Sequence, residues 1–213
     1  MAFFPSSGFH YRHVINHGPR NPGLITLSFD DGPDPELTPL ILDILEKHKV
    51  KAAFFIIGRK IRGNEDIVQR MINDGHIIGN HSWAHTNLWD FYSSKQMIAD
   101  IDKNIRETEI VTGKRMKLFR PPYGVINPMV ARAIRKTGVK VITWSFRSFD
   151  TSSRSPVALL KKAQNKVKEG DILLFHDTSG ITAEILENLI VTLQGKKYRF
   201  VPLDELINTP VYE

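Results

Sequence analysis

Along this chain, short runs of apolar residues alternate with longer segments in which apolar residues recur every three or four positions. The short runs predict strands near residues 24–29, 51–57, 77–79, 116–119, 139–144, 172–175 and 198–201. The longer segments predict helices at about residues 36–48, 66–74, 95–113, 127–137, 156–169 and 182–193. This repeated strand–helix order indicates a parallel sheet with helices outside it, as a barrel or a doubly wound sheet. No linker, low-complexity tract or internal repeat suggests a second domain.

Two of the predicted helices carry clear boundary signals. In segment 95–113 apolar residues recur at helical spacing, and Gly113 is the expected terminator. Pro156 suits the first turn of the next-to-last helix, directly after Ser155. We therefore expect these two helices to end and begin at these residues.

The first predicted strand ends abruptly in two carboxylates, Asp30 and Asp31, followed by Gly32-Pro33, which forces a turn. Neighbouring side chains of a regular strand point to opposite faces, but at a bending strand end both carboxylates can enter one cavity. Two carboxylates this close repel each other, and a bound cation is the simplest way to keep both ionised. The alternative is that the Asp-Asp-Gly-Pro segment is only a polar turn.

Other reactive side chains also follow predicted strands. They are His81 and His85 after the third strand, Arg120 after the fourth, Asp150 after the fifth, and His176 and Asp177 after the sixth. The carboxyl ends of parallel strands form the active-site face of α/β folds. We therefore expect these segments to meet Asp30 and Asp31 at one rim.

The two histidines and one aspartate predict a metal site. His81 and His85 lie four residues apart, so on a helical turn their imidazoles would share a face and bind one ion. Together with Asp31 they form a two-histidine, one-carboxylate set, which suits a divalent transition metal with open positions. Asp30 is then free to take a proton from a water whose pKa the metal lowers. Arg120 is suited to hold Asp30 by a charge-assisted pair, or alternatively makes only a surface or structural salt bridge.

Composition and charge exclude several classes of site. The chain has 213 residues, 41% of them hydrophobic and 24% charged, which is typical of a globular protein of one domain. It has no cysteine, which excludes disulfides, cysteine-ligated zinc and thiol nucleophiles. A net charge of +6 favours an anionic surrounding, such as a wall polymer or a nucleic acid. The basic residues form short separate clusters without a recognition motif, so we expect no nucleic-acid partner.

The sequence leaves the cellular location open. The longest purely apolar run, residues 52–57, is far shorter than the ~20 residues that span a bilayer, so we expect no transmembrane segment. Residues 1–9 include Pro5 and Gly8 and are too short for a secretion signal. The protein is therefore cytoplasmic as it stands, or extracytoplasmic if a leader was removed. The pattern predicts no oligomeric state.

Five motifs in this sequence resemble, in order, those of the polysaccharide deacetylases, which form the NodB-homology domain or carbohydrate esterase family 4. They are Ser28-Phe29-Asp30-Asp31-Gly32, His81-Ser82-Trp83-Ala84-His85, Arg120-Pro121-Pro122-Tyr123-Gly124, residues 144–150, and Leu174-Phe175-His176. The resemblance runs from residue 24 to the C-terminus. It implies a deformed (β/α) barrel of about seven or eight mostly parallel strands. Residues 24–213 would be the catalytic domain, and residues 1–23 an extension packing on the barrel.

The resemblance also implies a role for each motif residue. Asp30 would be the general base, with Arg120 orienting it, and Asp31, His81 and His85 would hold zinc or else cobalt, nickel or manganese. His176 would be the general acid with Asp150 as its charge partner, or alternatively a neutral buried histidine. The backbone N–H of Tyr123 would help hold an oxyanion, and Leu174 would line the pocket for the acetate methyl group. Pro121 and Trp144 would also contact substrate.

The fourth motif departs from the family pattern. Where the family often has Asp-x-x-Asp-Trp, this chain has Arg147-Ser148-Phe149-Asp150-Thr151, so only the second aspartate is kept. The missing tryptophan would normally wall the acetyl pocket, so the departure bears on pocket shape and substrate class. Trp144, Phe149 and Trp83 are the aromatic residues that could replace it, and each could equally belong to the core.

The motifs together predict a metal-dependent hydrolase that removes acetyl groups from N-acetylated sugars of a polysaccharide, giving acetate and a free amino sugar. Peptidoglycan is the first expected substrate, followed by a chitin-like glycan. The alternatives are an O-acetyl esterase, or a deacetylase or deformylase of a smaller sugar precursor. A non-enzymatic alternative is a carbohydrate-binding protein on an inactive scaffold, although binding alone does not require a base, ligands and an acid together.

Overall fold

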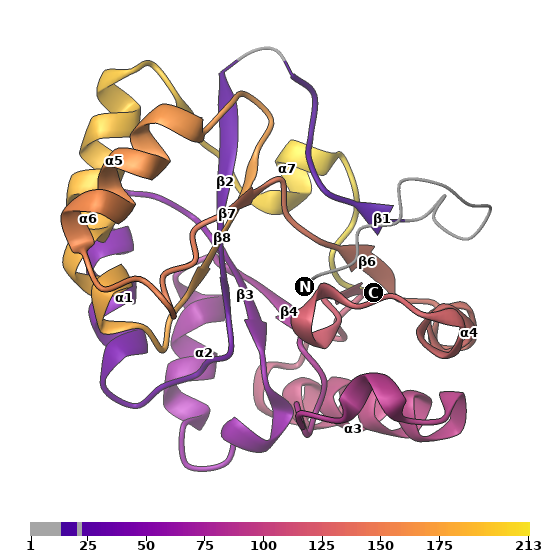
Figure 1. Ribbon diagram of the computed structural model, residues 1–213. Helices are drawn as coiled ribbons and strands as arrows, with labels where there is room; N and C mark the ends of the chain where they lie inside the picture. The colour runs from indigo at the N-terminus through magenta and orange to yellow at the C-terminus, as the bar shows by residue number, and fades with distance from the viewer. Residues whose placement is uncertain (1–13, 21–22) are drawn as a thin grey trace.

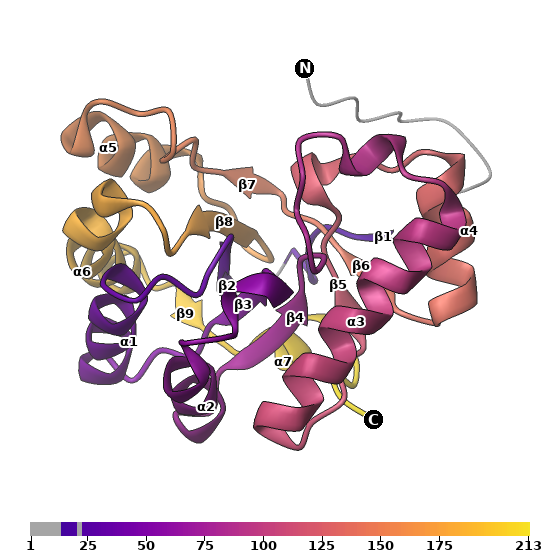
Figure 2. The same cartoon turned by 90° about the horizontal axis from the view of Figure 1, so that it is seen from below.

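The computed structural model describes residues 14–20 and 23–213. Within them, eight strands follow one another in the order β1-β6-β5-β4-β3-β2-β8-β7, every neighbouring pair is parallel, and β9 also pairs with β2. The sheet curves, and no pairing joins its two end strands β1 and β7 in the described part of the chain (Figures 1 and 2). The predicted deformed barrel of parallel strands is therefore confirmed.

The strands are short and most lie within the predicted runs. Their bounds are Val14–Ile15 (β1), Leu24–Asp30 (β2), Ala53–Ile56 (β3), Ile77–Asn80 (β4), Leu118–Phe119 (β5), Lys140–Ile142 (β6), Phe146–Arg147 (β7), Ile172–His176 (β8) and Arg199–Phe200 (β9). The α-helices are Leu37–Lys47 (α1), Glu65–Asn73 (α2), Ser94–Thr112 (α3), Pro128–Thr137 (α4), Pro156–Lys166 (α5), Gly180–Gly195 (α6) and Leu203–Ile207 (α7). Three single-turn 3₁₀ helices are Gly58–Lys60 (η1), Trp89–Phe91 (η2) and Pro122–Gly124 (η3).

Helices cover the outer face of the sheet in the same order as the strands beneath them. Going around the molecule, α4 contacts α3, α3 contacts α2, α2 contacts α1, α1 contacts α6, and α6 contacts α5 (Figure 2). The two predicted helix boundaries are confirmed. Gly113 caps α3 in the left-handed conformation, and the Ser155 side chain caps the first turn of α5.

The sheet separates two hydrophobic clusters, which explains why its strands are apolar on both faces. In β3, Phe54 belongs to the large cluster between the sheet and its helices, whereas Phe55 belongs to a smaller cluster with α7. Strand β2 differs, because its outward residues Ile25, Leu27 and Phe29 are apolar while Thr26, Ser28 and Asp30 are polar. Strand alternation therefore turns Asp30 away from the apolar cluster beneath the helices.

Besides the 3₁₀ turns, the sequence pattern missed two strands and one α-helix, all of them short. Strands β1 and β7 have two residues each, and α7 has five. A two-residue strand has no measurable period, and α7 is shorter than two helical turns, so local pattern gives little signal for either. β1 places Val14 and Ile15 beside β6 within the sheet. Residues 1–13 and 21–22 lie outside the described residues, so the predicted extension over 1–23 stays a prediction.

In the part of the chain that the structure describes, none of the helices combines the length and apolar character needed to cross a membrane.

Helix α3 provides a direct test of how much the outer core contributes to stability. Ile101 is fully buried on this helix, whereas Ile110 is 83% exposed. Ile101→Ala should lower the free energy of unfolding by about 2–5 kcal/mol, because it removes buried methyl groups and leaves a cavity. Ile110→Ala should change it by less than about 0.5 kcal/mol. Urea denaturation followed by circular dichroism measures both, and equal losses would contradict the assigned packing of α3.

Candidate active site

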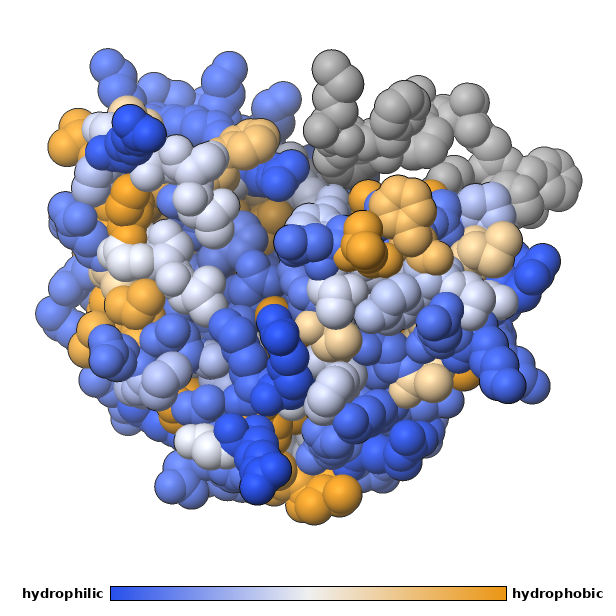
Figure 3. Space-filling model, turned by 60° about the horizontal axis from the view of Figure 1, so that its bottom comes forward, coloured by the Kyte–Doolittle hydropathy of each residue, from blue (hydrophilic) through white to orange (hydrophobic). Residues whose placement is uncertain are grey.

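One pocket opens at the carboxyl ends of the strands and brings most of the predicted site residues together. It has a volume of about 250 Å³ and is lined by Asp30, Asp31, His81, His85, Pro121, Tyr123, Gly124, Trp144, Arg147, Thr151, Leu174 and His176. Figure 2 views the molecule from the end at which β2 terminates. The prediction that these strand ends meet at one rim therefore agrees with the structure. The surface tilted toward this side is mostly hydrophilic, with scattered hydrophobic groups (Figure 3).

Asp30 is held by a fully buried arginine. Arg120 donates from Nη1 to Asp30 Oδ1 at 2.6 Å and to Ser28 Oγ at 3.0 Å. Its Nε and Nη2 donate to the main-chain carbonyls of Ile142 and Thr143, and the guanidinium carbon lies 3.9 Å from the centre of the Phe55 ring. A buried charge is tolerated only when it is paired and hydrogen-bonded, and Arg120 meets both conditions. The surface salt-bridge alternative for Arg120 is therefore wrong.

Asp31 reaches the same pocket because the chain turns sharply after β2. Its φ is 75°, in the left-handed region, so it leaves the alternation of the strand. The next residue must be glycine, because a Cβ on Gly32 would lie 1.9 Å from Oδ2 of buried Asp177. Burial raises the pKa of Asp177 to about 7, although the hydrogen bond that Thr38 donates to it acts to lower the pKa. Asp177 therefore packs behind the turn that carries Asp31, a contact that the sequence did not assign.

The histidine pair lies on a loop, and the expected helical turn is not present. Residues 81–85 contain no helix, and Ser82 and His85 both have positive φ, at 66° and 43°. These two left-handed residues fold the loop so that the imidazole rings lie 4.7 Å apart. The Ser82 hydroxyl accepts a hydrogen bond from the His85 N–H at 2.7 Å. The two imidazoles therefore lie on the same side of the chain, as expected, but the conformation of the loop brings them together and not the spacing of a helix.

Side chains of α3 hold this loop, and the sequence pattern gave them no role. The Asp100 carboxylate accepts hydrogen bonds from the N–H groups of Trp83 and Ala84 and from the Trp89 indole. Asn104 Nδ2 donates to the Ser82 carbonyl at 2.8 Å. The sequence did contain a signal for this role. Asp100 and Asn104 are polar residues on the apolar face of an amphipathic helix, the face that also carries Ile101.

Asp31, His81 and His85 fit a divalent metal ion. Their ligand atoms all lie within 4.8 Å of one another, and the Nε2 atoms of His81 and His85 lie 3.5 and 3.3 Å from Asp31 Oδ1. That oxygen is buried and accepts no hydrogen bond from the described residues. His81 Nδ1 lies 2.7 Å from the Arg120 carbonyl, which can only accept, so Nδ1 carries the proton and Nε2 is free to ligate.

His85 has the charge state that a metal ligand requires. Burial first, and then the charge of His81, lower the pKa of His85 to about 4, although Asp31 opposes the shift. The imidazole is therefore neutral at physiological pH, and a neutral imidazole is the form that binds metal.

His176 and Asp150 form a second buried pair at the far side of the pocket. His176 Nδ1 donates to Asp150 Oδ1 at 2.8 Å, and its Nε2 lies 3.9 Å from Asp31 Oδ2. Burial lowers the pKa of His176, but the hydrogen bond and charge of Asp150 outweigh it and raise the pKa above its ordinary value. Asp150 also accepts from Ser148 and Thr182. Burial raises the Asp150 pKa, and its partners, His176 foremost, bring it below the usual range.

The remaining predicted substrate-binding residues line the pocket wall. Tyr123 has a φ of 59°, and its ring lies 5.1 Å from that of His85. Pro121, Leu174 and Trp144 contribute apolar surface to the same wall. The roles of all these residues stay predictions.

The altered fourth motif also borders the pocket, through Arg147 and Thr151. Of the three aromatic residues considered there, Trp144 lines the pocket. Phe149 is 48% exposed beside it, and the indole of Trp83 donates to Glu107 of α3.

Three known proteins show what this chain is similar to. The peptidoglycan-N-acetylglucosamine deacetylase PgdA of Listeria monocytogenes is 37% identical over 186 residues, covering 85% of this chain but only 38% of PgdA. The solved structure of the Bc1960 peptidoglycan N-acetylglucosamine deacetylase matches with a TM-score of 0.91 and 30% identity, covering 99% of this chain and all of the other. BA3943 of Bacillus anthracis, a carbohydrate esterase family 4 pseudoenzyme, matches with a TM-score of 0.83 and 29% identity over 91% of this chain and 68% of its own.

The family profile extends this similarity across most of the site. The profile described as polysaccharide deacetylase matches residues 17–142, which include the carboxylate pair, both histidines and Arg120. The matched range exceeds half of the chain. With this match and the two-histidine, one-carboxylate pocket, the chain belongs to the polysaccharide deacetylase family.

Proposed function

We propose that this protein removes acetyl groups from N-acetylated sugars of a polysaccharide, with peptidoglycan as the first expected substrate. One observation carries the proposal: a single pocket holds an arginine-bound carboxylate, a metal-ligand set and a histidine–aspartate pair. The names of PgdA and Bc1960 support the reaction and the polymer. Because the chain spans only 38% of PgdA, the activity of that longer protein does not transfer automatically.

The proposed cofactor is one divalent ion, with zinc first and cobalt, nickel or manganese as the other candidates. Asp31, His81 and His85 would hold it, since their ligand atoms converge and a two-nitrogen, one-oxygen set suits these metals. When bound, such an ion lowers the pKa of a water ligand and polarises a carbonyl group.

Asp30 is the proposed general base. Arg120 occupies Asp30 Oδ1, while Oδ2 faces the pocket 3.8 Å from His81 Nε2. The pairing with Arg120 fixes the orientation of the carboxylate. Asp30 can then accept the proton of the water that attacks the acetamide carbonyl.

His176 is the proposed general acid. Its Nδ1 proton is bound to Asp150, which directs Nε2 into the pocket, and the raised pKa favours the form in which Nε2 carries a proton. Transfer of this proton to the sugar nitrogen lets the amine leave as the C–N bond breaks, giving acetate and an amino sugar. The Tyr123 N–H is the proposed oxyanion donor, and Leu174 and Trp144 the proposed wall for the acetyl methyl group.

The similarity to the pseudoenzyme BA3943 makes carbohydrate binding without catalysis the second candidate. Binding alone does not require an imidazole whose proton is held available by a buried carboxylate, so the His176–Asp150 pair favours the enzyme. Acetate release separates the two candidates.

The metal assignment predicts different outcomes for two adjacent aspartates. Wild-type protein should bind about one zinc ion per chain, and Asp31→Asn or His81→Ala should lose or greatly weaken this binding because each removes a ligand. Asp30→Asn is the matched control, which should keep the ion and lower kcat by about 10²–10⁴. Elemental analysis measures the zinc content of each variant, and calorimetry measures its affinity for zinc. If Asp30→Asn emptied the site and Asp31→Asn did not, the two roles would be exchanged.

The reaction class is tested on N-acetylglucosamine oligomers and acetylated peptidoglycan fragments. We expect acetate to be released while every glycosidic bond stays intact, and chelation should stop the release. A glycosidase needs two carboxylates facing each other across the bond, roughly 5–9.5 Å apart, whereas here one is held by arginine and the other joins the ligand set. Acetate assay and chromatography of the products decide the class. Shortened oligosaccharides, or glycan binding without acetate, would refute the deacetylase.

The His176–Asp150 pair predicts a defined change in pH dependence. Because Asp150 raises the pKa of His176, Asp150→Asn should lower that pKa, and the alkaline limb of the kcat/KM profile should move to lower pH. His176→Ala should cost about 10²–10⁴ in kcat and leave the metal content unchanged. A limb that stays in place or moves upward in Asp150→Asn would show that Asp150 does not tune the acid.

A further inference from the structure

Arg147 is a cation in the pocket that the proposed chemistry does not use. It is partly buried and lines the same pocket as the metal-ligand set. Of the other charged groups in and behind the pocket, Asp30 is paired with Arg120 and Asp150 with His176, while Asp31 belongs to the proposed metal-ligand set. Among the described residues, no carboxylate lies within ion-pair distance of Arg147, and its guanidinium donates no hydrogen bond. Its N–H donors are therefore available to a ligand.

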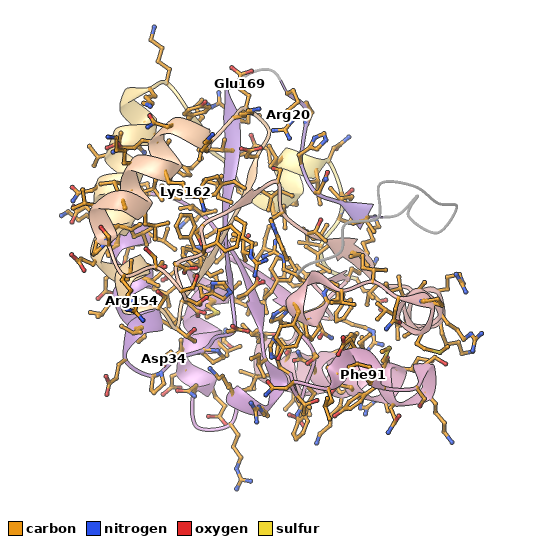
Figure 4. All side chains as sticks on the ribbon, viewed as in Figure 1. Arg20, Asp34, Phe91, Arg154, Lys162 and Glu169 are labelled. Carbon is orange, nitrogen blue, oxygen red and sulfur yellow. The ribbon has the colours of Figure 1, made fainter. Side chains whose placement is uncertain are left out.

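Two aromatic rings and one lysine hold Arg147 in place. The guanidinium carbon lies 4.7 Å from the ring centre of Phe149 and 5.6 Å from that of Trp144. Phe149 adopts a φ of 65°, which is rare for a bulky residue and places its ring beside the arginine. Lys162 of α5, labelled in Figure 4, donates to the carbonyls of Arg147 and Ser148 at 2.9 and 2.8 Å. Contact with ring faces leaves the in-plane N–H donors of a guanidinium exposed.

An unpaired and positioned guanidinium selects for a particular ligand chemistry. Its planar fork matches a carboxylate, which can accept two parallel hydrogen bonds. Lys162 adds a second positive charge nearby, with Nζ 4.3 Å from the Phe149 ring centre. A neutral sugar hydroxyl would gain much less from this arrangement than an anionic group.

We propose that Arg147 is a specificity-determining residue that binds a carboxylate carried by the acetylated glycan. The inference rests on the proposed function and adds a substrate class to it. The pocket should prefer an N-acetylated sugar chain bearing free carboxylates, such as lactyl ethers, over a neutral chain of the same length. A chain whose lactyl carboxyls are bound in amides lacks this charge and loses the preference.

Three tetrasaccharides of equal length test the carboxylate. The first is neutral and contains only N-acetylglucosamine, the second alternates N-acetylglucosamine with N-acetylmuramic acid carrying free lactyl carboxylates, and the third is the second with its carboxyls converted to methylamides. Wild-type kcat/KM should be highest for the second, mainly through KM, and the advantage should shrink as salt is raised. Equal values for the second and third in the wild type would overturn the proposal.

Variants then assign any preference to Arg147. Arg147→Met keeps much of the side-chain length and apolar contact but removes the charge, so the preference for carboxylate over methylamide should fall about 10- to 100-fold. Arg147→Lys should recover part of it. Arg154→Met is the control, because Arg154 is an exposed arginine on the loop just before α5 and does not line the pocket (Figure 4). An unchanged preference in Arg147→Met would overturn the proposal.

A binding measurement separates this proposal from the catalytic one. Calorimetry with zinc-supplemented Asp30→Asn should give a lower Kd for the carboxylate chain than for its methylamide, and adding Arg147→Met should abolish the difference. If wild type releases no acetate but this difference is present, the deacetylase proposal fails and the role of Arg147 stands. If acetate is released and Kd does not distinguish the two chains, the role of Arg147 fails and the deacetylase stands.

Discussion

The buried guanidinium of Arg120 is the contact on which the rest of the pocket depends. It joins the end of β2, through Asp30 and Ser28, to main-chain carbonyls at the end of β6. Its own carbonyl fixes the tautomer of His81. A fully buried arginine is costly unless every donor is used, so removing any partner would leave an uncompensated charge in the core. The proposed base and a proposed metal ligand are therefore held by one residue, through its side chain and its main-chain carbonyl respectively, and the carboxyl ends of non-neighbouring strands are kept at a fixed separation.

Left-handed backbone at the strand ends is the second requirement of the site. Asp31, Ser82, His85, Tyr123 and Phe149 all have positive φ, and all lie in or directly beside the pocket. Such conformations cost free energy in non-glycine residues and persist only where surrounding contacts hold them. A buried carboxylate, Asp100, and a buried amide, Asn104, both on α3, supply those contacts for the histidine loop. The stability of the outer layer of helices is thus linked directly to the geometry of the proposed metal ligands.

The charges of the pocket divide into two functional groups. Arg120 orients Asp30, the proposed base, and Asp150 outweighs the effect of burial and raises the pKa of His176, the proposed acid. Arg120 and Asp150 are both buried and do not line the pocket. Arg147 instead lines the wall, has no carboxylate partner among the described residues, and is proposed to act on what binds. Family membership does not by itself fix activity, since a similar structure belongs to a pseudoenzyme. The complete acid–base set is the feature of this chain that favours catalysis.

The sequence by itself determined the strand–helix order, the parallel barrel and the set of residues that meet at its rim. It could do so because burial imposes a local period on each long element, and because parallel strands bring their carboxyl ends together. Only the tertiary structure decided that the histidine pair sits on a loop with two left-handed residues, that Asp100 supports this loop, and that Arg147 has no acidic partner among the described residues. These features depend on contacts between residues far apart in the chain, for which local periodicity carries no information. Strands β1 and β7 were missed for the same reason, since their pairing partners define them.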